Sequence, residues 1–111
     1  MPNPIMLDDP AFKCLRVRDL EGYRRAAAGR KLLDFSGTDL RGTDFRGVDT
    51  SNVILKDAYL RDADLRGCDL RQSNLEGASL HNAKVAGAYF SADLPAAEVL
   101  LSLQYGTRLR A

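Results

Sequence analysis

The sequence predicts a coiled, all-β solenoid, and three regularities between residues 33 and 92 predict it. Large apolar side chains recur at every fifth position, smaller side chains recur two residues before them, and turn-forming residues recur two residues after them. A period of five fits neither a helix, which repeats about every 3.6 residues, nor a flat strand, which repeats about every 2. A unit this short cannot bury its own apolar face, so it must stack on its neighbours.

The central position of each five-residue unit is predicted to point inward. Eleven of the twelve central residues are large and apolar, and the exception is Thr50. The predicted core-stacking residues are Phe35, Leu40, Phe45, Leu55, Leu60, Leu65, Leu70, Leu75, Leu80, Val85 and Phe90. The residues two positions earlier, such as Ala58 and Ala63, form a second inward set of smaller side chains.

Each repeat unit also carries a residue type suited to the bend between two short sides. Ten of the twelve residues that follow a central position by two are Gly, Asn or Asp. These residue types adopt turn dihedrals at low cost. The chain is therefore predicted to turn after each side and to coil.

Units such as Thr38-Asp39-Leu40-Arg41-Gly42 and Ala63-Asp64-Leu65-Arg66-Gly67 resemble the A(D/N)LXX repeat of pentapeptide-repeat proteins. The resemblance covers about 60 of the 111 residues in twelve tandem units. That family forms a right-handed quadrilateral β-helix with four units to a coil. The resemblance therefore implies about three coils in which residues twenty apart stack. Departures from the usual Asp or Asn occur at Ile54, Tyr59, Ser79, Lys84 and Tyr89.

Residues 1–32 are predicted to form an N-terminal capping segment. Phe12 to Leu20 alternates well enough for a strand, which would make a degenerate partial coil, and Tyr23 to Ala28 is typical of a short helix that ends near Gly29. This segment has seven basic and four acidic residues, a net charge of +3. We expect it to cover the first face of the stack.

Residues 93–111 are predicted to form a C-terminal helix and tail. Asp93 is an N-cap type of residue, Pro95 suits a first turn, and Gly106 is a plausible stop after Tyr105. One apolar stripe comprises Ala96, Val99, Leu100 and Leu103, and a second comprises Leu94, Ala97, Leu101 and Tyr105. One stripe would suffice to cover the last coil, so the second is the predicted homodimer interface.

The outer walls of residues 33–92 are ordered by charge, with nine acidic and seven basic residues and a net charge of −2. Asp44 is expected to stack under Asp64, and Arg46 under Arg66, and like charges stacked in this way repel. Neighbouring columns of opposite charge can offset this through pairs that each contribute about 0 to 1 kcal/mol.

The sequence predicts no catalytic residues, no cofactor and no metal site. Two carboxylates about 5 Å apart would have the spacing of a retaining glycosidase, but Asp44 and Asp64 would lie on a convex wall with no cleft to exclude water. His81 is the single histidine and is expected to face solvent, and Cys14 and Cys68 are expected to remain reduced thiols.

The predicted function is a non-catalytic scaffold or protein-interaction module whose protein partner the sequence does not name. Outward-facing Ile54, Tyr59 and Tyr89 are candidate partner contacts, because aromatic residues dominate many protein interfaces. The other interpretation is that they cover coil edges or contact the terminal caps.

The alternative function comes from the resemblance. Some pentapeptide-repeat proteins mimic B-DNA and bind DNA gyrase as elongated dimers joined through a C-terminal helix. Here the repeat is nearly neutral, and three coils give a height of about 14 Å against the roughly 34 Å of one DNA turn. Direct nucleic-acid binding is also disfavoured, because Asp39, Asp44 and Asp64 interrupt the arginines that would track phosphates.

A cytoplasmic location is expected by default. The chain does not open with a basic segment followed by an apolar run, and no stretch approaches eighteen apolar residues. We therefore expect neither export nor a membrane span.

Overall fold

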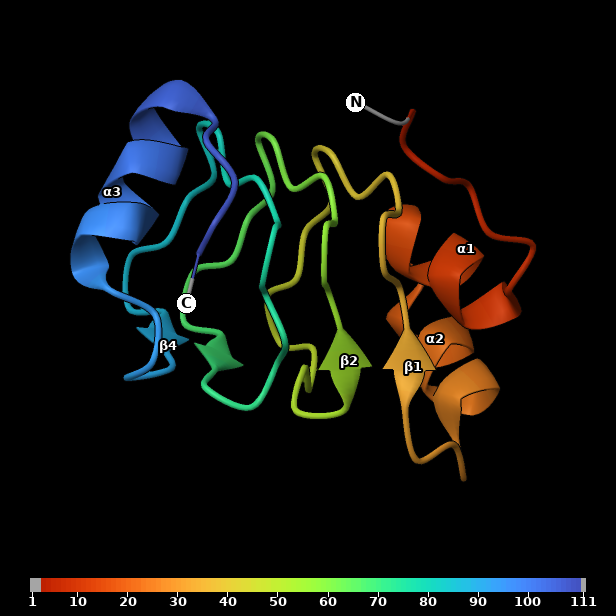
Figure 1. The fold of residues 1–111 in the computed structure, drawn as a ribbon. Coiled ribbons are helices and arrows are strands. Elements are labelled where there is room, and N and C mark those ends of the chain that lie inside the picture. Colours follow the sequence, from red (N-terminus) through yellow and green to blue (C-terminus); the bar gives the residue numbers. More distant parts are fainter. Residues whose placement is uncertain (1–2, 111) are drawn as a thin grey trace.

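The computed structural model describes residues 3–110, which measure 36 × 28 × 21 Å along the principal axes. The elements follow one another from one end of the molecule to the other (Figure 1). In chain order they are α1 (Pro10–Arg16), α2 (Leu20–Ala27), β1 (Leu33–Asp34), β2 (Val53–Ile54), β3 (Asp69–Leu70), β4 (Tyr89–Phe90) and α3 (Ala96–Tyr105). The strands are only two residues long, so most of the repeat is built from turns and single bridges.

Residues twenty apart in sequence lie side by side in parallel. β1 pairs with β2 with Leu33 opposite Val53, and β3 pairs with β4 with Leu70 opposite Phe90. The same register continues in isolated parallel bridges: Asp39 to Tyr59 to Ser79, Asp44 to Asp64 to Lys84, and Ile54 to Asn74. We refer to residues 33–52, 53–72 and 73–92 as coils one, two and three. The predicted stacking register of twenty is therefore present in the structure.

The turns use left-handed backbone at most of the expected positions. Gly42 has φ 71°, and the non-glycine residue Asp62, at the equivalent position of coil two, has φ 60°. Left-handed backbone strains L-residues least when they are Asn or Asp, which explains the residue types at these bends. Asn52, Gln72 and Ala92 occupy the remaining corner of each coil and are not left-handed. One corner of the stack therefore turns by a different geometry.

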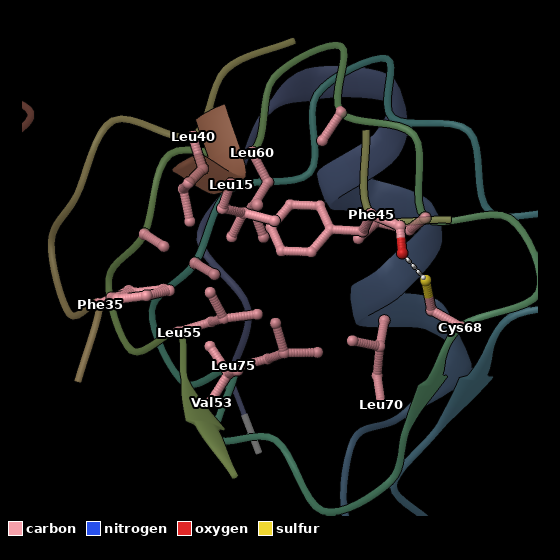
Figure 2. Close-up of a cluster of buried hydrophobic side chains, with 14 of the residues drawn as sticks. Leu15, Phe35, Leu40, Phe45, Val53, Leu55, Leu60, Cys68, Leu70 and Leu75 are labelled. Atoms are coloured by element: carbon pink, nitrogen blue, oxygen red, sulfur yellow. Dashed lines mark hydrogen bonds between the residues drawn. The ribbon is translucent and has the colours of Figure 1, made fainter. Parts of the chain in front are cut away.

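The core runs through the middle of the stack and is filled by the central residues of the repeat (Figure 2). The predicted core-stacking residues are buried, except that Val85 and Phe90 in coil three are only half-buried. Thr50 is also buried, and its hydroxyl donates to the carbonyl of Asp69 at 2.9 Å. On other sides a backbone amide makes this contact, as when the Leu40 N–H donates to the carbonyl of Tyr59. The polar side chain at position 50 therefore substitutes for one rung of the ladder.

The N-terminal segment differs from its prediction. The stretch expected to be a strand contains helix α1, because the Asp9 side chain accepts from the Ala11 N–H and Pro10 occupies the first turn. Residues 18–22, Arg-Asp-Leu-Glu-Gly, have the sequence pattern of one repeat unit, but they lead into α2, with Asp19 accepting from the Gly22 N–H at 2.9 Å. Helix capping thus overrides the alternating apolar pattern, and α2 begins three residues before the predicted Tyr23.

Helices α1 and α2 cover coil one. Phe12 and Leu15 are buried, and the ring of Phe12 meets that of Phe35 edge-on with centroids 5.5 Å apart. The segment before α1 adds a contact that the sequence did not predict: the Ile5 N–H donates to the Gly37 carbonyl, and the Ile5 carbonyl accepts from the Asp39 N–H. The outer edge of coil one is therefore paired at this side.

Helix α3 covers part of coil three. It begins with Pro95 as N-cap, without the side-chain cap that Asp93 was predicted to provide, and ends at left-handed Gly106. The chain then turns back, so that Leu109 is fully buried and Arg108 bridges Ser79 in antiparallel fashion. In residues 3–110 no helix has the length and apolarity needed to cross a bilayer.

Candidate interaction surfaces

The exposed side of α3 carries large apolar residues. Leu100, Leu101 and Tyr105 expose 65%, 43% and 65% of their surface, and Ala97 is also exposed. The buried side of the helix is formed by Val99, Ser102 and Leu103. Of the stripe predicted to cover the coil, Ala96 and Leu100 therefore face outward instead. Leu94, from the stripe predicted to form a dimer interface, lies before the helix and packs on the core.

Coil three is capped on one side, partly capped on a second and open on a third. On the second side, the Leu75 N–H donates no hydrogen bond within residues 3–110. The Leu80 N–H donates to the Ser102 hydroxyl at 2.8 Å, the Gly77 N–H to the Leu109 carbonyl, and the Asn82 N–H to the Leu103 carbonyl. On the next side of coil three, the amides at the positions that match Leu80 and Asn82 are those of Val85 and Gly87. These two amides donate no hydrogen bond within residues 3–110.

Val85 and Gly87 mark an open edge, as the coil before them shows. In coil two the matching amides donate to coil three: the Leu65 N–H to the Lys84 carbonyl and the Gly67 N–H to the Ala86 carbonyl. Unpaired edge donors beside apolar side chains are a template for pairing with another chain.

The three residues proposed as partner contacts lie in different environments. Ile54 is half-buried in the ladder between Asp34 and Asn74. Tyr59 is half-buried under Arg108, whose guanidinium lies 5.3 Å from the ring centroid and donates to the phenol oxygen at 3.2 Å. Tyr89 is 59% exposed, next to the guanidinium of Arg71. Only Tyr89 among the three thus presents an exposed ring, and it lies in coil three.

Aspartate and arginine two residues apart pair along the walls. In Asp39–Arg41, Asp44–Arg46, Asp64–Arg66 and Asp69–Arg71, the arginine Nη2 lies 2.7 to 2.8 Å from a carboxylate oxygen. The same aspartates accept from the backbone N–H of their arginines. These within-unit pairs neutralise the stacked charges, and Arg46 also reaches Asp64 of the next coil at 3.3 Å.

These hydrogen bonds favour the charged carboxylates. The side chain of Arg66 holds the pKa of Asp64 well below its usual range, and the side chain and backbone of Arg71 lower the pKa of Asp69 to about 2. Arg46 lowers the pKa of Asp44 in the same way. Asp44 and Asp64 are bridge partners, yet neither could supply the protonated carboxylic acid that a glycosidase needs.

Other side chains that could react or bind a metal ion are engaged in packing. Within residues 3–110, no cluster of three His, Cys, Asp or Glu side chains could hold a metal ion. Cys68 is buried with its thiol 3.3 Å from the Phe45 carbonyl (Figure 2), and burial raises its pKa. Cys14 is a free, half-buried thiol, and burial raises its pKa as well.

Sequence reasoning missed three residues of the C-terminal end. Ser102 lies on neither predicted stripe, because a hydroxyl in a helix is not counted as core-facing, yet it is fully buried and caps Leu80. Leu109 is also fully buried, and the only signal was its alternation with Arg108 and Arg110. The third is Leu100, whose exposure depends on how α3 rotates over the coil.

Comparison with known proteins supports the family resemblance. Residues 54–91 match the family model for pentapeptide repeats, in eight copies. No curated protein matches the chain. Coil one precedes the matched residues, but it pairs with coil two in the same register of twenty.

Two solved structures are similar to parts of the chain. A pentapeptide repeat protein (Rfr23) from the cyanobacterium Cyanothece 51142 is 29% identical over 52% of this chain and 36% of that chain, with a TM-score of 0.34. A pentapeptide repeat protein from the Arabidopsis thaliana thylakoid lumen is 35% identical over 53% of this chain and 44% of that chain, with a TM-score of 0.27. The chain spans less than half the length of either. Residues 54–91 of this chain are therefore pentapeptide repeats.

Proposed function

We propose that this protein is a non-catalytic scaffold that pairs with a second copy of itself through the C-terminal end face. We define this face as Leu100, Leu101 and Tyr105 of α3 together with Val85 and Tyr89 of coil three. The observation that carries the proposal is the open edge at Val85 and Gly87, whose amides lack acceptors within residues 3–110, two residues before the exposed ring of Tyr89. A second copy would cover both.

The proposal includes the geometry of the repeat. We infer that residues 33–92 form a right-handed quadrilateral β-helix of about three coils, as the family resemblance implies. Its support is that parallel pairing with a register of twenty occurs at four places around the coil, near residues 34, 39, 44 and 69. Such a stack presents rigid walls and a defined end, which suits a scaffold.

A non-catalytic role is supported by the state of the wall carboxylates. Each of Asp39, Asp44, Asp64 and Asp69 is paired with an arginine of its own unit. The same pairing weighs against the alternative of a DNA mimic that binds gyrase, because mimicry needs walls of unneutralised carboxylates. A supercoiling assay with a large molar excess of this protein distinguishes the two: inhibition of gyrase would support the mimic. The cytoplasmic location expected from the sequence stays a prediction.

Sedimentation velocity over a range of protein concentrations tests self-association. We expect the wild type to form a dimer, and Leu101→Glu to remain monomeric because a carboxylate would be buried in the interface. Val17→Glu is the matched control, since Val17 is 75% exposed at the opposite end of the molecule. A monomeric wild type, or equal loss of the dimer in both variants, would refute the proposal.

A partner other than a second copy can be sought with the same pair of variants. Tagged wild type, Leu101→Glu and Val17→Glu would each be used for a pull-down from bacterial lysate, quantified by mass spectrometry. A protein enriched with wild type and Val17→Glu but lost with Leu101→Glu would name a partner of the C-terminal end face. Enrichment that is equal in all three would place that partner elsewhere on the scaffold.

A further inference from the structure

One wall of the stack carries a column of basic side chains at the same position of three successive coils. Arg41, Arg61 and His81 are twenty residues apart, and the bridges from Asp39 to Tyr59 to Ser79 fix their register. Adjacent coils are about 4.8 Å apart, so the three side chains follow one another closely. Together with Tyr105 and Gly106 at the end of α3, they line a hollow of about 320 Å³.

Arg61 lacks the partner that the other wall arginines have. Arg41 donates from Nε and Nη2 to Asp39, each at 2.8 Å, as the repeat pattern predicts. Two residues before Arg61 the chain carries Tyr59 in place of Asp, so no carboxylate of its own unit is available. Its one ion pair in the described chain joins Arg61 Nε to a carboxylate oxygen of Asp62 at 3.8 Å, and both side chains are exposed to solvent. Such a pair contributes little.

The same departure occurs one coil further along. Two residues before His81 the chain carries Ser79, whose hydroxyl donates to the Gly106 carbonyl at 3.0 Å and so ties the end of α3 to the wall. The turn at Gly106 lies close against the imidazole, since a Cβ at this glycine would come within 3.2 Å of His81 Nδ1. The helix end therefore forms one side of the hollow.

The carbonyl groups at the end of α3 are largely satisfied within the protein. The Ser102 carbonyl accepts from the Gly106 N–H at 2.8 Å, and the Leu103 carbonyl accepts from the Asn82 N–H at 3.0 Å. What faces the hollow is basic or hydroxylated: Arg41, Arg61, His81, Tyr59 and Tyr105.

We propose that this hollow binds the phosphate group of a small phosphate-bearing molecule, with Arg61 as the main contact. Arg41 already pairs with Asp39, so the anion would pair chiefly with Arg61. A guanidinium binds phosphate oxygens bidentately, and the imidazole adds a donor. A long nucleic acid does not fit, because Asp44 and Asp64 are in the neighbouring column.

Isothermal titration calorimetry with inorganic pyrophosphate tests the proposal. We expect one saturable site on the wild type and at least about tenfold weaker binding by Arg61→Gln, equivalent to about 1.4 kcal/mol. The matched control is Arg71→Gln, which removes an arginine of nearly equal exposure, 61% against 60%, from a wall outside the hollow. Binding to this control should stay within about twofold of the wild type, because only a distant charge is lost.

The single histidine supplies a second readout. His81 gives the only imidazole signals of the chain in NMR spectra, and these should shift on titration with pyrophosphate and saturate at the calorimetric Kd. Loss of affinity in Arg71→Gln equal to that in Arg61→Gln would mean attraction by net charge alone and would overturn the proposal. So would heat without a His81 shift, tighter binding to duplex DNA than to pyrophosphate, or no saturable binding.

Discussion

The two ends of the repeat stack are closed to different degrees. At the N-terminal end, two helices cover coil one, and Phe45 in that coil is fully buried. At the C-terminal end, one helix crosses coil three, and Phe90 is only half-buried against the core. Exposed apolar residues occur at both ends: Ile5, Met6, Val17 and Leu32 at the N-terminal end lie outside the helices, whereas Leu100, Leu101 and Tyr105 at the C-terminal end lie within α3.

In the proposed scaffold, this difference would combine stability at one end with assembly at the other. A stack of three coils needs both ends closed to hold its core, and residues 3–32 close one end within the chain. At the other end, the backbone amides of Gly77, Leu80 and Asn82 are capped, whereas those of Leu75, Val85 and Gly87 are not. These open amides are the part of the end that the proposed second copy would cover.

Truncating one central phenylalanine at each end gives the largest expected contrast. Phe45→Ala should lower the free energy of unfolding by about 3 to 5 kcal/mol, because a large, fully enclosed side chain is lost. Phe90→Ala should cost less than about half of that. Urea unfolding followed by circular dichroism, at protein concentrations where the chain is monomeric, measures both. Equal losses would show that the C-terminal end is as closed as the N-terminal end.

Weakening the N-terminal cap should cost nearly as much as weakening the core. Leu15 of α1 is fully buried, so Leu15→Ala should lower the free energy of unfolding by about 2 to 5 kcal/mol. Leu103→Ala in α3 is the counterpart, and it should cost less because Leu103 is only partly buried. The same urea experiment compares them, and a larger loss for Leu103→Ala would reverse the roles assigned to the two caps.

The hydroxyl of Ser102 should contribute more than a typical helix serine. It accepts from the Leu80 N–H at 2.8 Å and is fully buried, so Ser102→Ala would leave a buried donor unpaired. We expect a loss of about 1 to 3 kcal/mol. Ser91→Ala is the control, since Ser91 accepts from the Asp93 N–H in an exposed turn. The cap assignment fails if the two variants lose the same stability.

The wall pairs should make the smallest contribution and should appear in the pH dependence. The pKa of folded Asp69, about 2, lies below the ordinary value of about 3.9, so its stabilisation is fully present above about pH 4 and is lost as pH falls towards 2. An NMR titration of the Asp69 carboxyl carbon measures this pKa. Arg71→Gln should raise it towards the ordinary value, and an unchanged pKa would contradict the pairing.

Much of the stack could be predicted from the sequence because its interactions are local and periodic. The five-residue period gives the inward residues, the Gly, Asn and Asp positions give most of the turns, and four units to a coil gives the register of twenty. The paired walls were foreseen only as diagonal contacts between coils. The structure places the shorter contacts within each unit, because Asp and Arg two residues apart meet across one side.

The two ends could not be predicted in the same way, since they are not periodic. The alternating residues from Phe12 to Leu20 fit a strand, and only the side-chain caps of Asp9 and Asp19 convert them into helices. The exposed face of α3 depends on tertiary packing, which turns Ser102 inward and Leu100 outward. Candidate surfaces at the C-terminal end therefore required the structure.

Hydrogen exchange at the Val85 and Gly87 amides, measured by NMR at low and high protein concentration, tests the proposed assembly most directly. These amides lack acceptors within the described chain, so they should exchange rapidly in the monomer. If a second copy covers the C-terminal end face, their exchange should slow severalfold as the protein associates, while amides of α1 and α2 stay unchanged. Association that leaves the Val85 and Gly87 amides unprotected, or that protects the N-terminal helices instead, would contradict the account.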